Sequence, residues 1–216
     1  MKTTQGTQGR VRPMQIIDAA VRVIMERGLA DTRISDIAER AGVSPALVLY
    51  YFDSKDKVLS EALTYANEGF YLRISREILR LPSARDQLIR LIELSTPGLD
   101  TLDHQWDDEY ILWLELYIRA LRDPEMAKDR EALDRRWHGV ITEIIRNGQQ
   151  AGEFPNVDPD EAAIRLRALM DGMSILLVLR DTDMTPERMR DACIDYSAHL
   201  IGFEVPERAA APAKSS

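Results

Sequence analysis

Cysteine, histidine and long apolar runs are scarce in this sequence. The 216 residues include one cysteine, Cys193, and three histidines, so an internal disulfide is excluded and a single thiol cannot build a metal cluster. No apolar run is long enough to span a bilayer, and the N-terminal residues lack the apolar core of a secretion signal. We therefore expect a protein of the reducing cytoplasm, without a metal site or a membrane partner.

Motifs of catalysis are lacking as well. The sequence contains no glycine-rich phosphate loop and no paired histidine and carboxylate residues at metal-binding spacing. We therefore expect no enzymatic activity, no catalytic residue and no cofactor.

Basic residues are outnumbered, with 28 Lys and Arg against 36 Asp and Glu, which gives a net charge of −8. An even spread of this charge would argue against a nucleic-acid partner. Residues 1–55, however, hold eight basic and six acidic residues, which leaves a net charge of −10 on the remainder. A weakly basic end on an acidic body is typical of a protein that touches phosphate with that end only.

Residues 33–52 carry the pattern of two short amphipathic helices around a tight turn. Apolar residues of the first helix recur at helical spacing, and Gly42 supplies the backbone freedom that a sharp reversal needs. Ser44 is a good N-cap, and Pro45 occupies the first helical position, where its missing N–H costs nothing. This pattern predicts a helix-turn-helix whose second helix reads a DNA major groove.

Candidate DNA contacts surround this motif. Thr32 is expected to cap the first of the two helices and, with Arg33, to meet a phosphate. Lys55 lies in the first turn of the next helix, where a cation opposes the helix dipole and an external anion would stabilise it. The reading helix is mostly apolar, so we expect part of the specificity to come from DNA shape. Its candidate residues are Ser44, Pro45, Ala46, Leu47, Leu49, Tyr50 and Tyr51.

The stretch from Arg12 to Leu59, with IIDAA, ERG and DTRISDIAERAGVSPALVLYYFDSKDKVL, resembles the DNA-binding domain of the TetR family of transcriptional regulators. The resemblance implies a repressor that leaves its operator when a small molecule binds, and it places Lys55 on the DNA backbone. Leu49 departs from the tyrosine that family members often carry, and Tyr50 is the substitute that we expect. Farther along, DPEM, RW and AGEF resemble the regulators of choline and amine metabolism.

Residues 103–122 form the most aromatic part of the chain. Trp106, Tyr110, Trp113 and Tyr117 recur at spacings of four, three and four, so they line one face of a helix. Such a stripe either packs an ordinary core or lines a ligand cavity between helices. With nearby carboxylates, a cavity of this kind favours a cationic or amine-bearing effector. The candidate ligand residues are Trp106, Glu109, Tyr110, Trp113, Glu115, Tyr117, Trp137, His138 and Asp171.

Two apolar helices are expected near the C-terminus, one over residues 159–180 and one that begins at Thr185. The first is apolar nearly all round in its C-terminal half, so it must be buried on more than one side. The family resemblance implies that these two helices pair with their copies in a homodimer on a near-palindromic operator. The alternative is that they only complete the core of one chain.

Together these patterns predict an all-α DNA-binding transcriptional regulator. We expect a flexible tail at 1–9, a helix-turn-helix domain at 10–55, an effector-binding and dimerisation domain at 56–204 and a second flexible tail at 205–216. Double-stranded operator DNA, a small-molecule effector and a second copy of the chain are the expected partners. The alternative function is a protein-interaction adaptor that has this fold but does not bind DNA.

Overall fold

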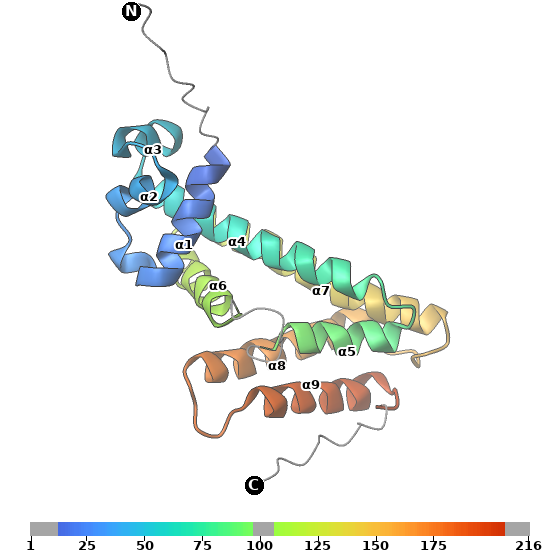
Figure 1. Cartoon of the computed structure of the whole chain (residues 1–216). Helices are drawn as coiled ribbons and strands as arrows, with labels where there is room; N and C mark the ends of the chain where they lie inside the picture. Colours follow the sequence, from blue (N-terminus) through green and yellow to red (C-terminus); the bar gives the residue numbers. More distant parts are fainter. Residues whose placement is uncertain (1–12, 97–105, 206–216) are drawn as a thin grey trace, which may run out of the picture. The chain divides into compact units, whose positions relative to one another are not determined.

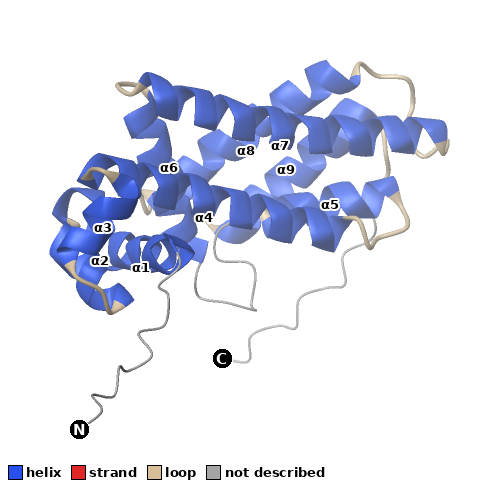
Figure 2. Ribbon diagram, turned by 90° about the horizontal axis from the view of Figure 1, so that it is seen from above, coloured by secondary structure: helices blue, strands red, loops and turns tan. Residues whose placement is uncertain are grey.

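The computed structural model describes residues 13–96 and 106–205, with residues 106–109 described as helix backbone only. Within these ranges the chain is helical and contains no strand, which confirms the all-α prediction (Figure 2). The expected tails lie outside the described residues, except for Val205. The helices are α1 (Pro13–Asp31), α2 (Ile34–Ala41), α3 (Pro45–Phe52), α4 (Lys55–Ile78), α5 (Ala84–Leu94), α6 (Trp106–Ala120), α7 (Pro124–Gln150), α8 (Pro159–Val178) and α9 (Pro186–Ile201) (Figure 1).

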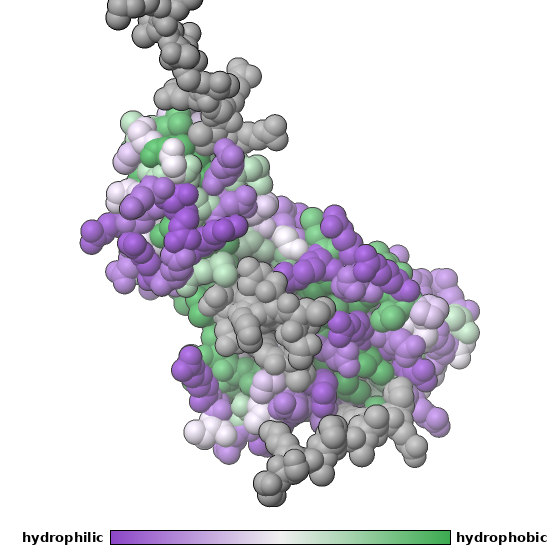
Figure 3. Space-filling view, in the orientation of Figure 1, coloured by the Kyte–Doolittle hydropathy of each residue, from purple (hydrophilic) through white to green (hydrophobic). Residues whose placement is uncertain are grey.

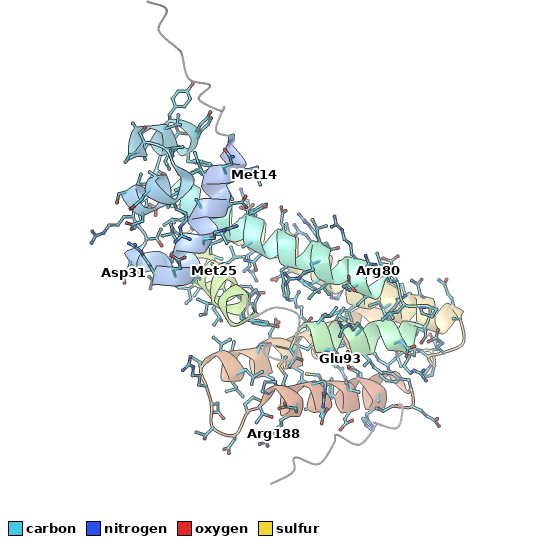
Figure 4. All side chains as sticks on the ribbon, viewed as in Figure 1. Met14, Met25, Asp31, Arg80, Glu93 and Arg188 are labelled. Atoms are coloured by element: carbon cyan, nitrogen blue, oxygen red, sulfur yellow. The ribbon has the colours of Figure 1, made fainter. Side chains whose placement is uncertain are left out.

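Local chemistry explains where many of these helices begin and end. Ser44, Ser83, Asp158 and Thr185 precede α3, α5, α8 and α9, and each side chain accepts a hydrogen bond from a backbone N–H of the first turn. Such caps satisfy donors that have no partner inside the helix. Gly28 interrupts α1 with a φ of 78°, and a further helical turn then runs to Asp31, which Figure 4 labels.

The chain packs as two compact units, which we describe separately. Unit 1 combines Met1–Leu72 with Asp107–Asp134, and unit 2 combines Arg73–Trp106 with Arg135–Ser216. The long helices α4 and α7 therefore contribute to both. The units reflect packing, and the functional boundary near residue 55 stays a prediction.

The core of unit 1 joins the helix-turn-helix to the first part of the body. Ile24 of α1, Ile37 of α2 and Val48 of α3 are fully buried in one cluster. Leu116 of α6 and Met126 of α7 belong to the same cluster. The three N-terminal helices therefore share a core with α4, α6 and the first turns of α7. Because this core is closely packed, a shift in α6 or α7 would displace the side chains that support the helix-turn-helix.

In unit 2, α8 and α9 run side by side, and α5 packs against α9 (Figure 1). The turn after α7 is tied to the start of α5 by the carboxylate of Glu153. This group accepts hydrogen bonds from the Ser83 hydroxyl (2.9 Å), the Ala84 N–H (3.2 Å) and the Arg85 N–H (3.1 Å). The negative charge thus lies at the positive end of the α5 dipole, which stabilises both elements.

Candidate DNA interface and effector site

The turn between α2 and α3 has the geometry of a helix-turn-helix. Gly42 ends α2 in the left-handed region (φ 67°, ψ 34°), and the Val43 N–H donates to the Ala38 carbonyl at 2.9 Å. Ser44 Oγ accepts from the N–H of Leu47 at 3.2 Å and starts α3. Gly42 adopts a conformation that favours glycine, and Ser44 supplies the N-cap of α3. The sequence AGVS therefore sets the reversal locally.

The outer face of α3 carries most of the predicted reading residues. Pro45 and Leu49, like Ala46 and Tyr50, are four residues apart, so these exposed side chains share one helix surface. Tyr50 is 77% exposed, and its ring meets that of Tyr51 edge-on at 5.5 Å. Figure 3 shows largely apolar and neutral residues over α3. Such a surface can contact thymine methyl groups and phosphates but offers few hydrogen bonds to base edges.

Thr32 does not occupy the predicted position. The N-cap of α2 is Arg33, and the N–H of Arg33 donates to the Asp36 carboxylate at 3.1 Å. The Thr32 side chain is 0% exposed, and its hydroxyl donates to the Gly28 carbonyl at 2.8 Å. The prediction of Thr32 as a cap is therefore wrong, because this hydroxyl instead satisfies the carbonyl of Gly28 at the interruption of α1.

Two ion pairs hold α2 against α1. Arg27 lies 3.0 Å from the Asp36 carboxylate, and Arg40 pairs with Glu26. The hydrogen bond from Arg40 lowers the pKa of the Glu26 carboxyl below its ordinary value. Figure 3 shows the hydrophilic surface over this end of unit 1. These contacts fix the orientation of α2, on which α3 packs.

Lys55, in the first turn of α4, is available to an external partner, unlike its charged neighbours. Its neighbour Asp56 pairs with Arg119 at 2.8 Å, and Lys57 lies 3.9 Å from both Glu61 and Glu125. Within the described residues the Lys55 side chain has no hydrogen bond or ion pair. A phosphate at this helix start would meet both the ammonium and free backbone N–H groups.

The aromatic stripe of α6 forms a series of ring contacts that extends to α4. Phe70 of α4 meets Tyr110 edge-on at 6.3 Å, and Tyr110 meets Trp113 at 5.9 Å. The Trp113 and Tyr117 ring centroids are 4.5 Å apart. We call these four residues the aromatic ladder. Three of them were predicted from spacing on one helix, whereas Phe70 is distant in sequence and only the fold brings it into the ladder.

The ladder ends beside a charged pair on α7. The Tyr117 hydroxyl donates to the Asp134 carboxylate at 2.6 Å, and the Arg130 guanidinium donates to the other oxygen at 2.6 Å. The guanidinium carbon lies 5.3 Å from the centre of the Tyr117 ring. The sequence analysis missed Arg130 and Asp134, although their spacing of four residues already indicated an ion pair on one helix face.

Glu115, another acid predicted for this stripe, lies on a different face of α6. Glu115 lies two residues from Trp113 and from Tyr117, and residues two apart on a helix do not share a face. Asp134, which α7 supplies, is the carboxylate that contacts the ladder. The side chains of Trp106 and Glu109 lie outside the described residues.

The remaining candidates belong to unit 2. His138 Nε2 lies 2.9 Å from the Asp160 carboxylate, which also pairs with Arg146 at 2.8 Å. Asp171 lies 4.0 Å from Arg167. Trp137 is half-buried on α7. The histidine and the aspartate thus contact protein groups of their own unit, and their ligand role stays a prediction.

Groups suited to metal binding or nucleophilic chemistry are scarce among the described residues. Among the described residues, no cluster of three or more His, Cys, Asp or Glu is placed to hold a metal ion. Cys193 is buried in α9, and burial raises the pKa of its thiol to about 12. The thiol therefore stays protonated and packs as a core side chain. In the part of the chain that the structure describes, none of the helices has the length and apolar character needed to cross a bilayer.

Comparison with protein families covers both halves of the chain. Residues 16–62 match the family of bacterial regulatory proteins named after TetR, and residues 84–202 match the C-terminal domain of BetI-type transcriptional repressors. The chain belongs to the TetR family of transcriptional regulators. Membership confirms the family predicted from residues 12–59. It also confirms the prediction of a DNA-binding regulator that is not an enzyme, since the relatives are transcriptional regulators.

Individual relatives support the same assignment for this TetR-family protein. The HTH-type transcriptional regulator BetI of Burkholderia cenocepacia is 28% identical over 76% of this chain and 80% of its own length. BetI of Burkholderia mallei is 25% identical over 90% and 96%. A transcriptional regulator of Saccharomonospora viridis, solved in complex with choline, is 33% identical over 88% and 96%, with a TM-score of 0.78. Nothing among these relatives supports the adaptor alternative.

Proposed function

We propose that this regulator represses transcription from a near-palindromic operator and that a quaternary ammonium or amine effector, bound at the aromatic ladder, releases it. The ladder carries this proposal, because aromatic faces beside the Asp134 carboxylate form the environment that an organic cation requires. The choline bound by the regulator of Saccharomonospora viridis supports the same ligand class. FadR of Bacillus subtilis, solved with stearoyl-CoA, is 24% identical and supports the fold alone.

The proposed DNA contacts come from α3 and from the starts of α2 and α4. Tyr50 and Tyr51 present hydroxyls near the end of α3, and Arg33 and Lys55 supply the cations. The contacts of the apolar side chains favour readout of groove shape over hydrogen bonds to bases. The proposed set is Arg33, Ser44, Pro45, Ala46, Leu47, Leu49, Tyr50, Tyr51 and Lys55.

The proposed homodimer is built mainly on α8. Ile164, Ala168, Gly172, Ile175 and Leu179 are all exposed, and their spacings of four, four, three and four place them on one helix face. Of the large apolar residues of α9, in contrast, Met189, Ile194 and Ile201 are buried within their own unit, and Leu200 is half-buried. A second copy of the same face would cover this stripe, and the small residues at 168 and 172 allow close approach of the two helices.

Release follows from the dimer. Two copies of α3 must enter successive major grooves about 34 Å apart. An effector that binds more tightly to a state with a different spacing lowers the operator-competent population in proportion to its differential affinity. The proposal assigns residues 10–55 to DNA binding and residues 56–204 to effector binding and dimerisation, in the cytoplasm.

The test is a fluorescence-anisotropy titration with labelled DNA from immediately upstream of the protein's own gene, at two salt concentrations. We expect saturable binding that weakens steeply with salt and is relieved by choline. It should not be relieved by 3,3-dimethylbutan-1-ol, the uncharged analogue of choline, or by stearoyl-CoA. Absence of binding at both salt concentrations would refute the operator proposal, and relief by the acyl-CoA alone would refute the cationic effector.

A further inference from the structure

The Arg130 guanidinium occupies the position against Tyr117 that an organic cation would take. It lies over the Tyr117 ring, 5.3 Å from the centroid, and donates to the Asp134 carboxylate at 2.6 Å. A ring face and a carboxylate are also the two partners that a ligand ammonium would need here. Both partners are therefore already used by a cation of the protein itself.

The geometry of Asp134 shows that this arrangement is built rather than incidental. Its side chain is 15% exposed, and its two oxygens are held by different residues, Tyr117 and Arg130. The Tyr117 hydroxyl therefore fixes the ring, and the ring in turn supports the guanidinium. Trp113, whose centroid is 4.5 Å from that of Tyr117, completes the aromatic surroundings of the tyrosine.

From these contacts we infer that Arg130 is an intramolecular competitor of the effector: it fills the cation position of the ladder in the free protein, and the ammonium of the effector displaces it. This inference rests on the proposed cationic effector and adds the residue that sets its affinity. Arg130 is thus a specificity residue, because a neutral ligand gains nothing from Asp134 that would offset the loss of the guanidinium contacts.

The position of Arg130 also links the exchange to the DNA-binding motif. Met126, four residues before it, and Leu133, three residues after it, lie on the same side of α7 and are buried in the core of unit 1. Ile37 of α2 and Val48 of α3 belong to that core as well. Displacement of the guanidinium would therefore shift the part of α7 whose buried side chains pack in the same core as the helix-turn-helix.

The direct test compares Arg130→Met with the wild-type protein in calorimetric titrations with choline and with 3,3-dimethylbutan-1-ol. Methionine keeps an unbranched apolar side chain and removes the charge. We expect the variant to bind choline about three- to tenfold more tightly, because choline no longer has to displace the cation–π contact and the ion pair of Arg130. The increase in affinity for the uncharged analogue should be smaller. Lys128→Met is the matched control, since it removes one exposed positive charge from the same helix.

A second measurement uses the unaltered protein and does not depend on how the variant folds. The Nε–H signal of Arg130 in a ¹⁵N spectrum, assigned by its absence in Arg130→Lys, should shift and exchange faster with water as choline saturates the site. A signal that stays unchanged at saturation would overturn the inference, and so would a choline affinity that Arg130→Met leaves unchanged or weakens. In both cases the proposed effector would stand.

Failure of the effector proposal gives a different pattern. If neither the wild type nor Arg130→Met binds choline while both still bind operator DNA, the cationic effector and the competitor role are both refuted. Choline binding by Arg130→Met alone would support the competitor role but would refute choline as an effector of the unaltered protein.

Discussion

Lys55 differs from its neighbours because its charge has no partner in the described structure. Asp56 is paired with Arg119, and Lys57 lies near two glutamates. A phosphate contact made by Lys55 would carry no sequence information, since every nucleotide presents the same group. Its contribution to binding is therefore expected to be the same on every operator variant.

We expect Lys55→Ala to weaken binding by a similar factor, about three- to tenfold, to the operator and to unrelated DNA. In a plot of log affinity against log salt concentration, the slope should decrease by about one for each Lys55 in the complex. Anisotropy titrations at several salt concentrations measure both effects. Lys57→Ala is the control and should have the smaller effect, because Lys57 is shared with Glu61 and Glu125. A loss confined to one sequence would refute the phosphate role.

The turn after α7 and the start of α5 are connected through a single carboxylate. Burial raises the pKa of Glu153, but hydrogen bonds from Arg85, Ala84 and Ser83 outweigh it, so that the net pKa lies below the ordinary 4.5. A depressed folded-state pKa stabilises the protein above the ordinary value, and the stabilisation is lost as the pH falls through the lowered pKa.

Glu153→Gln should therefore reduce the free energy of unfolding at pH 7 by about 1 kcal/mol, because the amide is a weaker acceptor than the carboxylate. The difference from the wild type should shrink once the pH falls below 4.5. Urea unfolding of both proteins across the acid range measures this. Glu187→Gln at the exposed start of α9 is the control. A difference that is constant with pH would show that the charge of Glu153 contributes nothing.

In the proposed homodimer, the exposed apolar face of α8 forms the interface. Leu179 is 70% exposed and Ile175 is 36% exposed, and both lie on the stripe that includes Gly172. A stripe of this kind on one chain would be covered by the same stripe on a second. Operator affinity then depends on the dimer, because each chain presents one α3 to the DNA.

Ile175→Glu should convert the dimer into a monomer, because pairing would bury two like charges. Operator affinity should fall by more than tenfold, since the second half-site is no longer bound by a linked copy. Sedimentation equilibrium and anisotropy measure the two effects. Leu79→Glu adds a charge at another exposed apolar residue of unit 2 and should leave both unchanged. Persistence of the dimer in Ile175→Glu would refute the α8 interface.

Much of the fold could be predicted because its signals are local. Ser44 caps α3 as predicted, and the last helix begins after Thr185 as predicted, since a cap involves only neighbouring residues. Thr32 was misplaced because its hydroxyl donates to the Gly28 carbonyl, where irregular backbone interrupts α1. A hydrophobic pattern contains no information about such a turn.

The helical class, the helix-turn-helix and the aromatic stripe of α6 follow from the sequence alone, because each depends on residues within a few positions of one another. Tertiary structure alone decided what the stripe contacts. Phe70 reaches the ladder from α4, and Arg130 and Asp134 reach it from α7. These contacts join residues that are far apart in the chain, and helical periodicity specifies which face is buried but not which helix covers it.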